Sequence, residues 1–559
     1  MKLPRPGGIS ATASLRKDRE AGERASDAVR SQAAGPTDPP FRRVLVANRG
    51  EIAVRIIRAC HELGIEAMAV FSDADATAGH VRAADSAVRL GSAPATESYL
   101  RGDAIIEAAL SGGAEAIHPG YGFLAERASF ARAVEAAGLV FIGPSTESIA
   151  AVGDKLAARR LARAAGVPVV PGTLEPAAVE RPDGVEAILA EADGVGFPLF
   201  VKAAAGGGGR GMRRVASRGE LPAALAAGSA EALAAFGDGA VYLEREVRPA
   251  RHIEVQLLGD ERGTIVAVGE RDCSIQRRNQ KLVEESPAPG LTVEERRELH
   301  ELAVRVARAA ELRNAATAEF LFDEDRRFWF LEVNTRLQVE HAVTELTSGI
   351  DLVREQILIA AGRPLSAATI AAAHGATTPG RHAIEVRLTA EDPARSFAPV
   401  AGRIGRWSMP SGPGVRVDTA IEAGDRIPPD YDSLIAKILV VDDDRDAAIR
   451  RLARVLDEVE VTGIQTSLPF HRFVAAHRGF AAAELSTDWV AAEWEPAMES
   501  DRAAALSLAS PVAVSVAEEA GSRTTTFPAV SPRLVGGHPS GSGWARAGRE
   551  DDVDRWPAR

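Results

Sequence analysis

Short apolar runs that alternate with alanine-rich stretches of helical period open the patterned part of the chain. The first run, at 43–47, leads into an apolar pattern of helical period that continues to Cys60. Three similar runs follow, at 67–71, 116–117 and 139–142. Because strands that alternate with helices are typical of a parallel sheet, we predict a parallel α/β domain that ends near Val152.

The middle of the chain then changes pattern twice. Between about residues 166 and 248 we predict strands at 197–202, 212–215 and 240–244, a glycine run at 206–209 and an alanine-rich helix before the last strand. A mixed region with strands near 253–258, 264–270, 317–322 and 328–334 extends to about Gly362. From Arg381 to Val440, short strands and turn signals predict a small β-rich domain, which a helix at 445–456 closes.

The composition is that of a globular protein with two unpatterned ends. Of 559 residues, 46% are hydrophobic and 26% are charged. Residues 1–40 and 500–559 lack periodicity and are rich in Pro, Ala and Ser, so we expect a disordered head and a mostly disordered tail. The net charge of −12 provides no general attraction for nucleic acid or anionic lipid. The two widely spaced cysteines and the absence of an apolar run of ~18 residues predict a cytoplasmic protein.

The segment 328–340 alternates with a period of two. If it is extended throughout, five polar side chains lie along one face, namely Glu332, Asn334, Arg336, Gln338 and Glu340. A solvated edge strand would show the same alternation. However, the apolar residues before Glu332 occupy both faces, so the strand enters a core before its polar row begins, which is typical of a strand that lines a cleft.

A hairpin brings a second carboxylate to this row. If the turn at 323–327 has its midpoint between Asp325 and Arg326, Glu319 faces Glu332 across the ladder. Two opposed carboxylates destabilise a sheet unless a cation or a shared proton joins them. Mg²⁺ (or Mn²⁺) takes hard oxygen ligands, and Asn334 adds a carbonyl oxygen nearby. The alternative is a solvated hairpin with a loose register.

The rare lysines and the glycine run indicate phosphate chemistry. Only six of the 66 basic residues are lysines, and four of these lie in patterned segments, at Lys155, Lys202, Lys281 and Lys437. A compact ammonium suits phosphate or bicarbonate, although chance placement is the alternative. Gly206, Gly208 and Gly211 match G-x-G-x-x-G, but a strand rather than a helix follows them. This context favours a mobile hairpin over phosphates and disfavours a dinucleotide fingerprint.

Six motifs in order along the chain resemble those of biotin carboxylases. They are Ala-Asn-Arg-Gly-Glu-Ile-Ala at 47–53, His-Pro-Gly-Tyr-Gly-Phe-Leu at 118–124, Gly-Asp-Lys at 153–155, the glycine loop, Glu-Arg-Asp-Cys-Ser-Ile-Gln-Arg-Arg at 270–278 and Glu-Val-Asn-Thr-Arg-Leu-Gln-Val-Glu-His at 332–341. The resemblance covers about residues 42–489. It implies an α/β, partly α+β, ATP-grasp fold. The expected parts are a Rossmann-like N-terminal domain at 41–152, an ATP-grasp domain at 153–362 with a lid at about 175–248, and a small β-rich C-terminal domain at 380–490.

The resemblance also implies roles for individual residues. Those expected to hold phosphates are Lys155, Lys202, Gly208 and Gly209. Those expected near adenine and ribose are the main chain from Glu244 to Val247, with His252 and Gln276. The metal ligands would be Glu319, Glu332 and Asn334. Bicarbonate would meet Lys281, Arg336 and Val339, with Glu340 as its base. Arg387, near Tyr121, would stabilise the biotin enolate.

The implied reaction is the ATP-dependent carboxylation of biotin. The family phosphorylates bicarbonate with ATP, and the transferring phosphoryl group calls for Mg²⁺, Lys and Arg held in place beforehand. A carbamoyl-phosphate synthetase half, which activates bicarbonate but uses ammonia, is one alternative. A non-catalytic ATP-binding regulator is another, although it would not need the bicarbonate and enolate-stabilising groups.

Biotin is expected to arrive in trans. In carriers of this family the biotinyl lysine typically stands between methionines, yet Met1 alone among the five methionines has a lysine beside it, and no lysine follows Lys437. Residues 542–549 resemble a segment that precedes the carrier in longer acyl-CoA carboxylase chains. We therefore expect the alpha component of an acyl-CoA carboxylase, with a biotin carboxyl carrier protein, a carboxyltransferase subunit and a second copy of the chain as partners.

Overall fold

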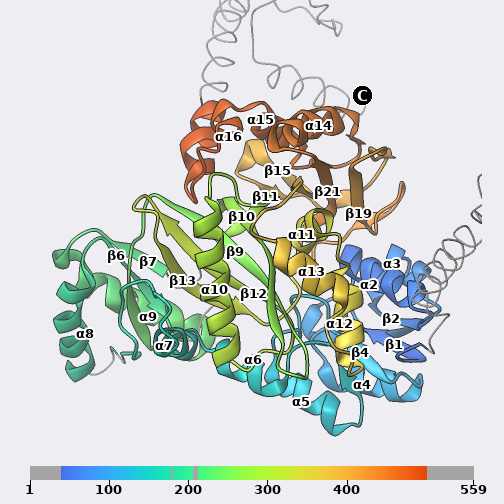
Figure 1. Ribbon diagram of the computed structural model, residues 1–559, viewed down its shortest axis with the longest axis horizontal. Helices are drawn as coiled ribbons and strands as arrows, with labels where there is room; N and C mark the ends of the chain where they lie inside the picture. Colours follow the sequence, from blue (N-terminus) through green and yellow to red (C-terminus); the bar gives the residue numbers. More distant parts are fainter. Residues whose placement is uncertain (1–38, 178, 180–181, 205–211, 500–559) are drawn as a thin grey trace, which may run out of the picture.

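The computed structural model describes residues 39–177, 179, 182–204 and 212–499 (Figure 1). Its N-terminal part, blue in Figure 1, is a five-stranded sheet in the order β3-β2-β1-β4-β5, and every pair in it is parallel. The strands are β1 (Arg43–Val46), β2 (Glu66–Ser72), β3 (Ser86–Gly91), β4 (Ala116–His118) and β5 (Val140–Phe141). The predicted parallel α/β arrangement is thus confirmed. The predicted disordered head and tail fall almost wholly outside the described residues.

Strand β3 is the one strand of this sheet that the apolar pattern did not predict. It lies at the sheet edge and pairs with β2 alone among the described strands. Of its six residues, Leu90 is the buried one. An edge strand needs little apolar surface because one side and much of its faces remain in contact with water, so hydrophobic periodicity does not reveal it.

A smaller antiparallel sheet, on the left of Figure 1, corresponds to the expected lid. Its order is β7-β6-β8, and Lys202 pairs with Met212 across β6 and β7. The strands are β6 (Leu199–Ala203), β7 (Met212–Val215) and β8 (Val241–Arg245), and the helices beside them are α8 (Pro182–Val195) and α9 (Leu221–Phe236). The strand that follows the glycine run is therefore confirmed, while Gly208 and Gly209 lie outside the described residues.

The central sheet has eight strands in the order β13-β12-β9-β10-β11-β14-β21-β19. Its members are β9 (Ala250–Gly259), β10 (Ile265–Arg277), β11 (Gln280–Ser286), β12 (Asn314–Asp323), β13 (Phe328–Asn334), β14 (His382–Thr389), β19 (Val415–Thr419) and β21 (Leu434–Asp442). Three of the strands from the predicted β-rich region, β14, β19 and β21, thus continue the central sheet. The short strands β15 to β18, β20 and β22 form two-stranded ladders beside it (391–392, 398–399, 402–403, 407–408, 426–427 and 460–461).

Side-chain alternation gives the central sheet one apolar and one charged face. On β9, Ile253, Val255 and Leu257 pack in one core with apolar residues of α10 (Val293–Ala309). The intervening residues of β9, which include Glu254, point to the other face. Helix α11 (His341–Ser348) packs on this second face, against β10, β11, β14 and β21. The second face is therefore where charged groups can meet a ligand.

The other helices cover the sheets, and several of them have a side-chain N-cap. They are α2 (Gly50–Glu62), α3 (Gly79–Ala83), α4 (Gly102–Ser111), α5 (Ala128–Ala136), α6 (Thr146–Gly153), α7 (Lys155–Ala164), α12 (Leu352–Ala360), α13 (Ala367–Gly375), α14 (Arg445–Glu458), α15 (Leu468–Ala476) and α16 (Arg478–Ala481). At the start of α7 the Asp154 carboxylate accepts a hydrogen bond from the Ala157 amide, which fixes the place of Lys155. No helix in the described part of the chain is long and apolar enough to cross a membrane.

Candidate active site

A row of charged residues runs across the second face of the central sheet. Glu254 on β9 lies directly opposite Glu319 on β12 and Arg271 on β10. Glu319 in turn lies opposite Glu332 on β13. Residues that are directly paired in a ladder share a face, so three carboxylates and a guanidinium stand side by side. Such a row is destabilising unless each carboxylate finds a cation.

The predicted pairing of Glu319 with Glu332 is confirmed, although the hairpin that produces it is irregular. The Asp323 amide donates to the Arg327 carbonyl, so the turn is centred on Asp325 and not after it. The register then shifts between Glu319 and the next residue, which leaves one extra residue on β13. This bulge compensates for the displaced turn and brings the two carboxylates opposite one another.

The polar row beyond Glu332 does not continue as an extended strand, so the condition for one shared face is not met. Strand β13 ends at Asn334, and Glu340 already occupies the N-cap of α11. Leu337 is fully buried, which draws the intervening loop into the core. The polar side chains still converge, because Arg336 donates to Gln338 Oε1 at 2.9 Å and Gln338 Nε2 donates to Glu319 Oε1 at 3.1 Å. The loop thus gathers the groups that a straight strand would have spread out.

Lys281 provides the cation at the centre of this face. Its Nζ lies 2.6 Å from Glu254 Oε2, 3.0 Å from Glu319 Oε1 and 2.7 Å from Glu340 Oε1. Burial lowers the pKa of Lys281, but these carboxylates outweigh it and hold the pKa well above the ordinary value. The ammonium is therefore fully charged and joins three strands and the start of α11.

Glu340 is ionised for the complementary reason. Burial raises its pKa, but Lys281, Arg387 and Arg271 together hold that pKa well below the ordinary range. Its second oxygen accepts a hydrogen bond from Arg387 Nη2 at 2.9 Å. A fully buried carboxylate that is kept charged can accept a proton from a ligand placed beside it.

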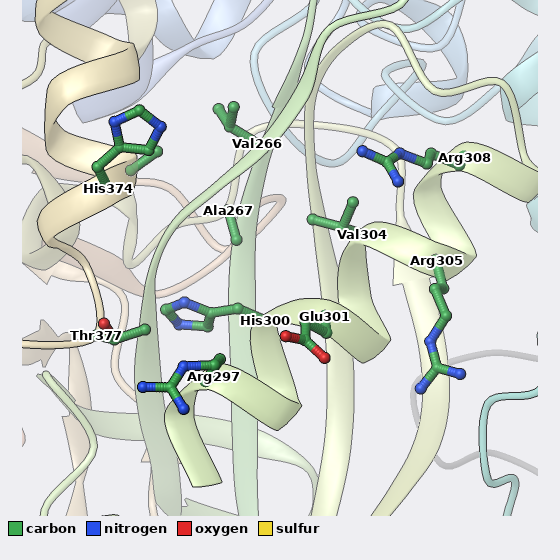
Figure 2. Close-up of a pocket in the computed structure, with 11 residues that line it drawn as sticks. Val266, Ala267, Arg297, His300, Glu301, Val304, Arg305, Arg308, His374 and Thr377 are labelled. Atoms are coloured by element: carbon green, nitrogen blue, oxygen red, sulfur yellow. The ribbon is translucent and has the colours of Figure 1, made fainter. Parts of the chain in front are cut away.

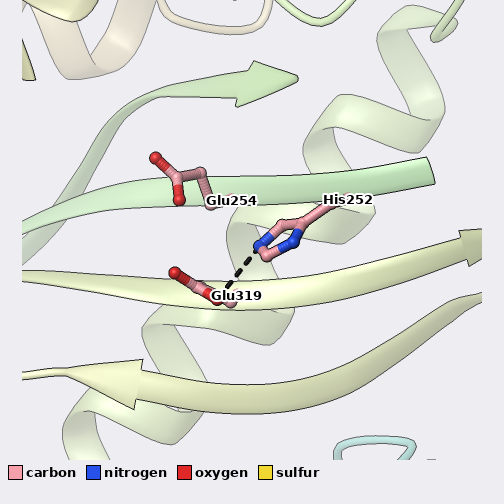
Figure 3. A group of neighbouring side chains, drawn as sticks. All are labelled: His252, Glu254 and Glu319. Atoms are coloured by element: carbon pink, nitrogen blue, oxygen red, sulfur yellow. Dashed lines mark ion pairs between the residues drawn. The ribbon is translucent and has the colours of Figure 1, made fainter. Parts of the chain in front are cut away.

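His252 and Gln276 lie beside the carboxylate row. His252 Nε2 is 3.0 Å from Glu319 Oε2, and His252 Nδ1 is 3.3 Å from Gln276 Nε2. Figure 3 shows His252 and Glu254 on one strand and Glu319 on the neighbouring strand, with the ion pair between His252 and Glu319. These three residues have the donor atoms of a metal site. Lys281 and Arg271, however, already pair with these two carboxylates, so this cluster has little need of an ion.

The predicted metal ligands form a second set, which shares Glu319 with the first and fits Mg²⁺. Glu319 and Glu332 face one another, and Asn334 Nδ2 donates to Glu319 Oε1 at 2.9 Å. Lys155 Nζ lies 3.1 Å from Glu332 Oε2, and Glu332 raises the pKa of Lys155. Rotation of the Asn334 amide presents its oxygen to the same space. Two carboxylates and an amide oxygen, with no sulfur or nitrogen donor required, are the ligand chemistry that Mg²⁺ prefers.

Glu244, one of the predicted nucleotide residues, is a buried carboxylate between two cations. Glu244 on β8 forms ion pairs with Lys202 on β6 and with Arg159 on α7. Burial raises the pKa of Glu244, but these two cations reverse the shift and lower it. Lys202 is thus held between the small sheet and α7, near Lys155 at the start of the same helix. Val247 lies just beyond β8 and is half-buried.

The residues predicted near biotin are connected through a second ionic group. Tyr121 donates a hydrogen bond to Glu51 Oε1 at 2.6 Å, and the fully buried Lys437 lies 3.3 Å from the same oxygen. Lys437 also donates to the Val339 carbonyl at 2.8 Å. Lys437 lies directly opposite Arg387 on the neighbouring strand. The arrangement links the N-terminal sheet to the loop that carries Val339.

Two residues of the site were not predicted from the sequence. Glu254 contacts the predicted residue Lys281 directly, and Arg271 forms an ion pair with Glu254. Arg271 is fully buried and donates to Gln256 Oε1 at 3.0 Å and to Thr344 Oγ1 at 2.8 Å. Glu254 did carry a signal, since a carboxylate inside a run of apolar strand residues requires a buried cation.

A separate cavity of about 730 Å³ lies between α10, α13 and β10. Figure 2 shows three arginines and two histidines around it, which are Arg297, Arg305, Arg308, His300 and His374. None of the predicted site residues lines this cavity. Its basic lining is therefore a different feature from the charged face of the sheet.

Family models match almost the whole described chain in three consecutive stretches. Residues 40–149 match "Biotin carboxylase, N-terminal domain", residues 154–368 match "Carbamoyl-phosphate synthase L chain, ATP binding domain" and residues 385–492 match "Biotin carboxylase C-terminal domain". The biotin carboxylase of Halalkalibacterium halodurans is 48% identical over 450 residues, which are 80% of this chain and 97% of that protein. The chain belongs to the biotin carboxylase family.

Two further relatives of the family extend the comparison. The biotin-dependent acyl-coenzyme A carboxylase alpha3 subunit of Mycobacterium leprae is 46% identical over 461 residues, which are 82% of this chain and 75% of that protein. The biotin carboxylase domain dimer of the Hydrogenobacter thermophilus 2-oxoglutarate carboxylase superposes with a TM-score of 0.77 at 42% identity, over 82% of this chain and 98% of that one. That structure is described as a complex with MgADP, ADP and bicarbonate.

Family membership confirms the expected ATP-grasp fold and the ligase class of the biotin carboxylases. The match of residues 154–368 alone would not distinguish a biotin carboxylase from a carbamoyl-phosphate synthase, since that family model carries the name of the synthase. The flanking N- and C-terminal stretches decide between them, because both match biotin carboxylase models.

Proposed function

We propose that the chain carboxylates biotin on a carrier protein, with ATP and bicarbonate as co-substrates, as the alpha component of an acyl-CoA carboxylase. The observation that carries this proposal is the position of Glu340, which is held between Lys281 and Arg387 at 2.7 and 2.9 Å. Bicarbonate activation and enolate stabilisation are thus served by one cluster. A protein that binds ATP only as a regulator would not need the contact between Arg387 and Glu340.

The first stage of the proposed reaction uses the Lys281 side of the cluster. Bicarbonate lies near Lys281, Arg336 and the Val339 main chain, and Glu340 accepts its proton. The deprotonated anion attacks the γ-phosphoryl group of ATP, the bond to the β-phosphate oxygen breaks, and carboxyphosphate and ADP are formed. Lys155 and Lys202 hold the phosphates. Glu319, Glu332 and Asn334 would hold Mg²⁺, which would neutralise charge on the transferring group.

The second stage uses the Arg387 side. Carboxyphosphate gives carbon dioxide and phosphate, and this phosphate takes the proton from the ureido nitrogen of biotin. The Arg387 guanidinium stabilises the enolate oxygen that develops. The nitrogen then attacks carbon dioxide. Water must be kept out while carboxyphosphate exists, and closure of the small β7-β6-β8 sheet over the nucleotide would exclude it.

The partners we propose follow from the family and from the lysine content. We infer that biotin comes from a carrier whose biotinyl lysine lies outside these 559 residues, since Lys437 is the last lysine and is fully buried. The acyl-CoA assignment is supported by the Mycobacterium leprae subunit, and the dimeric state by the Hydrogenobacter thermophilus domain dimer. A carboxyltransferase subunit would complete the enzyme.

One set of assays tests the proposal. ATP hydrolysis by the purified chain should require bicarbonate and should be stimulated by free biotin and more strongly by a biotinylated carrier. Ammonia should have no effect, and stimulation by ammonia in place of biotin would refute the proposal. With the host carrier and carboxyltransferase added, labelled bicarbonate should enter an acyl-CoA. Label that enters pyruvate or 2-oxoglutarate instead would overturn the acyl-CoA assignment. A denaturing streptavidin blot of the chain should be blank.

A further inference from the structure

Two buried carboxylates lie next to the cluster and have no part in the reaction as described so far. Glu284 on β11 and Glu385 on β14 are directly opposite one another in the ladder. Both are fully buried. Like charges in this position repel, and burial strengthens the repulsion because little water screens it. The pair therefore requires either a cation between its members or a proton on one of them.

On its β21 side Glu385 faces apolar residues. Leu439 lies directly opposite it on the other side, on β21, and packs in a small apolar cluster with Ala342, Val343 and Ala383. Neither carboxyl oxygen of Glu385 has a hydrogen-bond partner among the described residues. An ionised carboxylate without a partner in such surroundings is strongly unfavourable, whereas a neutral acid is tolerated.

The cations nearest Glu385 are directed elsewhere. The Lys437 ammonium lies against Glu51 at 3.3 Å and the Val339 carbonyl at 2.8 Å. Arg387 donates a hydrogen bond from Nε to Glu284 and another from Nη2 to Glu340. On α11, His341 is fully buried, and burial lowers its pKa to about 3, so this ring is uncharged. No described cation pairs with Glu385.

Glu284 differs from Glu385 in having a cation. Its Oε1 accepts a hydrogen bond from Arg387 Nε at 2.6 Å, while its Oε2 has no partner within the described part of the chain. The Arg387 guanidinium thus lies between Glu284 and Glu340, and Glu340 also contacts Lys281. The contacts of Arg387 with Glu284 and with Glu340 change differently during turnover, because only Glu340 is expected to gain a proton.

We propose that Glu284 and Glu385 share a single proton that resides on Glu385, and that the ionised Glu284 is a positioning residue for Arg387. The proposal rests on the proposed function. When Glu340 accepts the proton of bicarbonate, it loses its charge and weakens its hold on Arg387 Nη2. Glu284 still holds Nε, so the released edge of the guanidinium is free to meet the biotin enolate without the side chain swinging away.

The titration behaviour of the pair agrees with this division of roles. Burial, together with the charges of Glu284 and Glu340, raises the pKa of Glu385 well above its ordinary value against the opposing effect of Lys437 and Arg387. Burial raises the pKa of Glu284 to about 7, and Arg387 opposes that shift. The proton of the pair therefore prefers Glu385, on the apolar side.

Isosteric substitutions separate the two roles. Glu284→Gln removes the charge that holds Arg387 Nε, so biotin carboxylation should fall by about 10- to 100-fold, the effect of misplacing one catalytic group. Bicarbonate-dependent ATP hydrolysis without biotin should stay within about threefold of wild type, since that reaction does not involve the contact between Arg387 and the biotin enolate. Glu385→Gln mimics the neutral acid and should leave both activities within about twofold.

Two controls protect the interpretation. Glu270→Gln neutralises a buried carboxylate of the same sheet that pairs with Arg296 and His300, so it should change thermal stability without changing the ratio of the two activities. Glu284→Asp keeps the charge and should recover part of the lost carboxylation. A merely structural role for Glu284 would instead lower both activities together, in proportion to lost folded protein.

A spectroscopic measurement tests the shared proton without any assay of turnover. The infrared difference spectrum between wild type and Glu385→Gln should contain the carbonyl band of a protonated carboxylic acid at neutral pH. An ionised carboxylate band in its place would overturn the proposal, as would a loss of activity in Glu385→Gln equal to that of Glu284→Gln. An unchanged activity ratio in Glu284→Gln would overturn the anchoring role. Because the infrared result does not depend on catalysis, a failure of the proposed function gives a different outcome.

Discussion

Replacing Lys281 with methionine removes the cation that three buried carboxylates share. The ammonium lies 2.6 to 3.0 Å from Glu254, Glu319 and Glu340. Each carboxylate keeps another donor, so the loss corresponds to about one broken buried ion pair and not three. We expect Lys281→Met to lower the free energy of unfolding by about 3–5 kcal/mol. Bicarbonate-dependent ATP hydrolysis should also be lost.

The pH dependence of the loss of stability in Lys281→Met identifies its cause. The pKa values of Glu319 and Glu340 are held below the ordinary range against the effect of burial, so the stability that they contribute is present above about pH 4.3 and is lost as the pH falls. The pKa of Lys281 is raised, so its contribution stays complete below about pH 10.4. The deficit of Lys281→Met should therefore be largest near neutral pH and should shrink as the pH falls below about 4.3.

Urea and thermal unfolding at several pH values measure this deficit. Arg132→Met, which removes an exposed cation from α5, is the matched control and should change stability by less than about 0.5 kcal/mol at each pH. A deficit below about 1 kcal/mol in Lys281→Met would be that of a surface pair and would refute the shared-cation argument. A deficit that does not change with pH would show that the loss comes from packing and not from the carboxylates.

Three other experiments test separate parts of the protein. Glu319→Gln and Glu332→Gln should weaken Mg²⁺-dependent turnover far more than ATP binding measured without metal, and wild-type turnover in either variant would remove the metal assignment. Arg387→Ala should abolish biotin carboxylation while leaving much of the slow bicarbonate-dependent ATP hydrolysis, whereas a parallel fall would place Arg387 in an earlier step. Burial raises the pKa of Cys60 to about 12 and that of Cys273 well above its ordinary value, so neither thiol should react with iodoacetamide at pH 8 before unfolding. Rapid native alkylation of Cys273 would contradict its description as a buried, protonated core residue.

The pairing of Glu319 with Glu332 could be predicted because a two-residue period leaves few registers open. The period fixes which side chains share a face, and the short turn limits the choice of partners. The bulge and the displaced turn could not be predicted, and the pairing held only because the two compensate one another. The motifs identified the family in the same way, through residues close together in sequence.

The partners of the charged groups could not be found from the sequence. Lys281 contacts residues up to 59 positions away, and Arg387 reaches Glu284 across 103 positions. Such contacts depend on the order of strands in the central sheet, which local periodicity does not determine. The role of Glu385 was hidden for a second reason. Its protonation follows from the apolar side chains around it and not from its own position in a motif.

The pairing of β11 with β14 has a consequence for how the protein must be handled and how it unfolds. These strands come from the two stretches that match separate family domains, yet they are neighbours in one sheet. A fragment cut near residue 380 would leave β11 as an unprotected edge, with free amide and carbonyl groups that invite pairing between molecules and aggregation. It would also remove Arg387, which pairs with Glu284 and Glu340. In hydrogen-exchange experiments the amides of both strands should open together, as one cooperative unit of the native state.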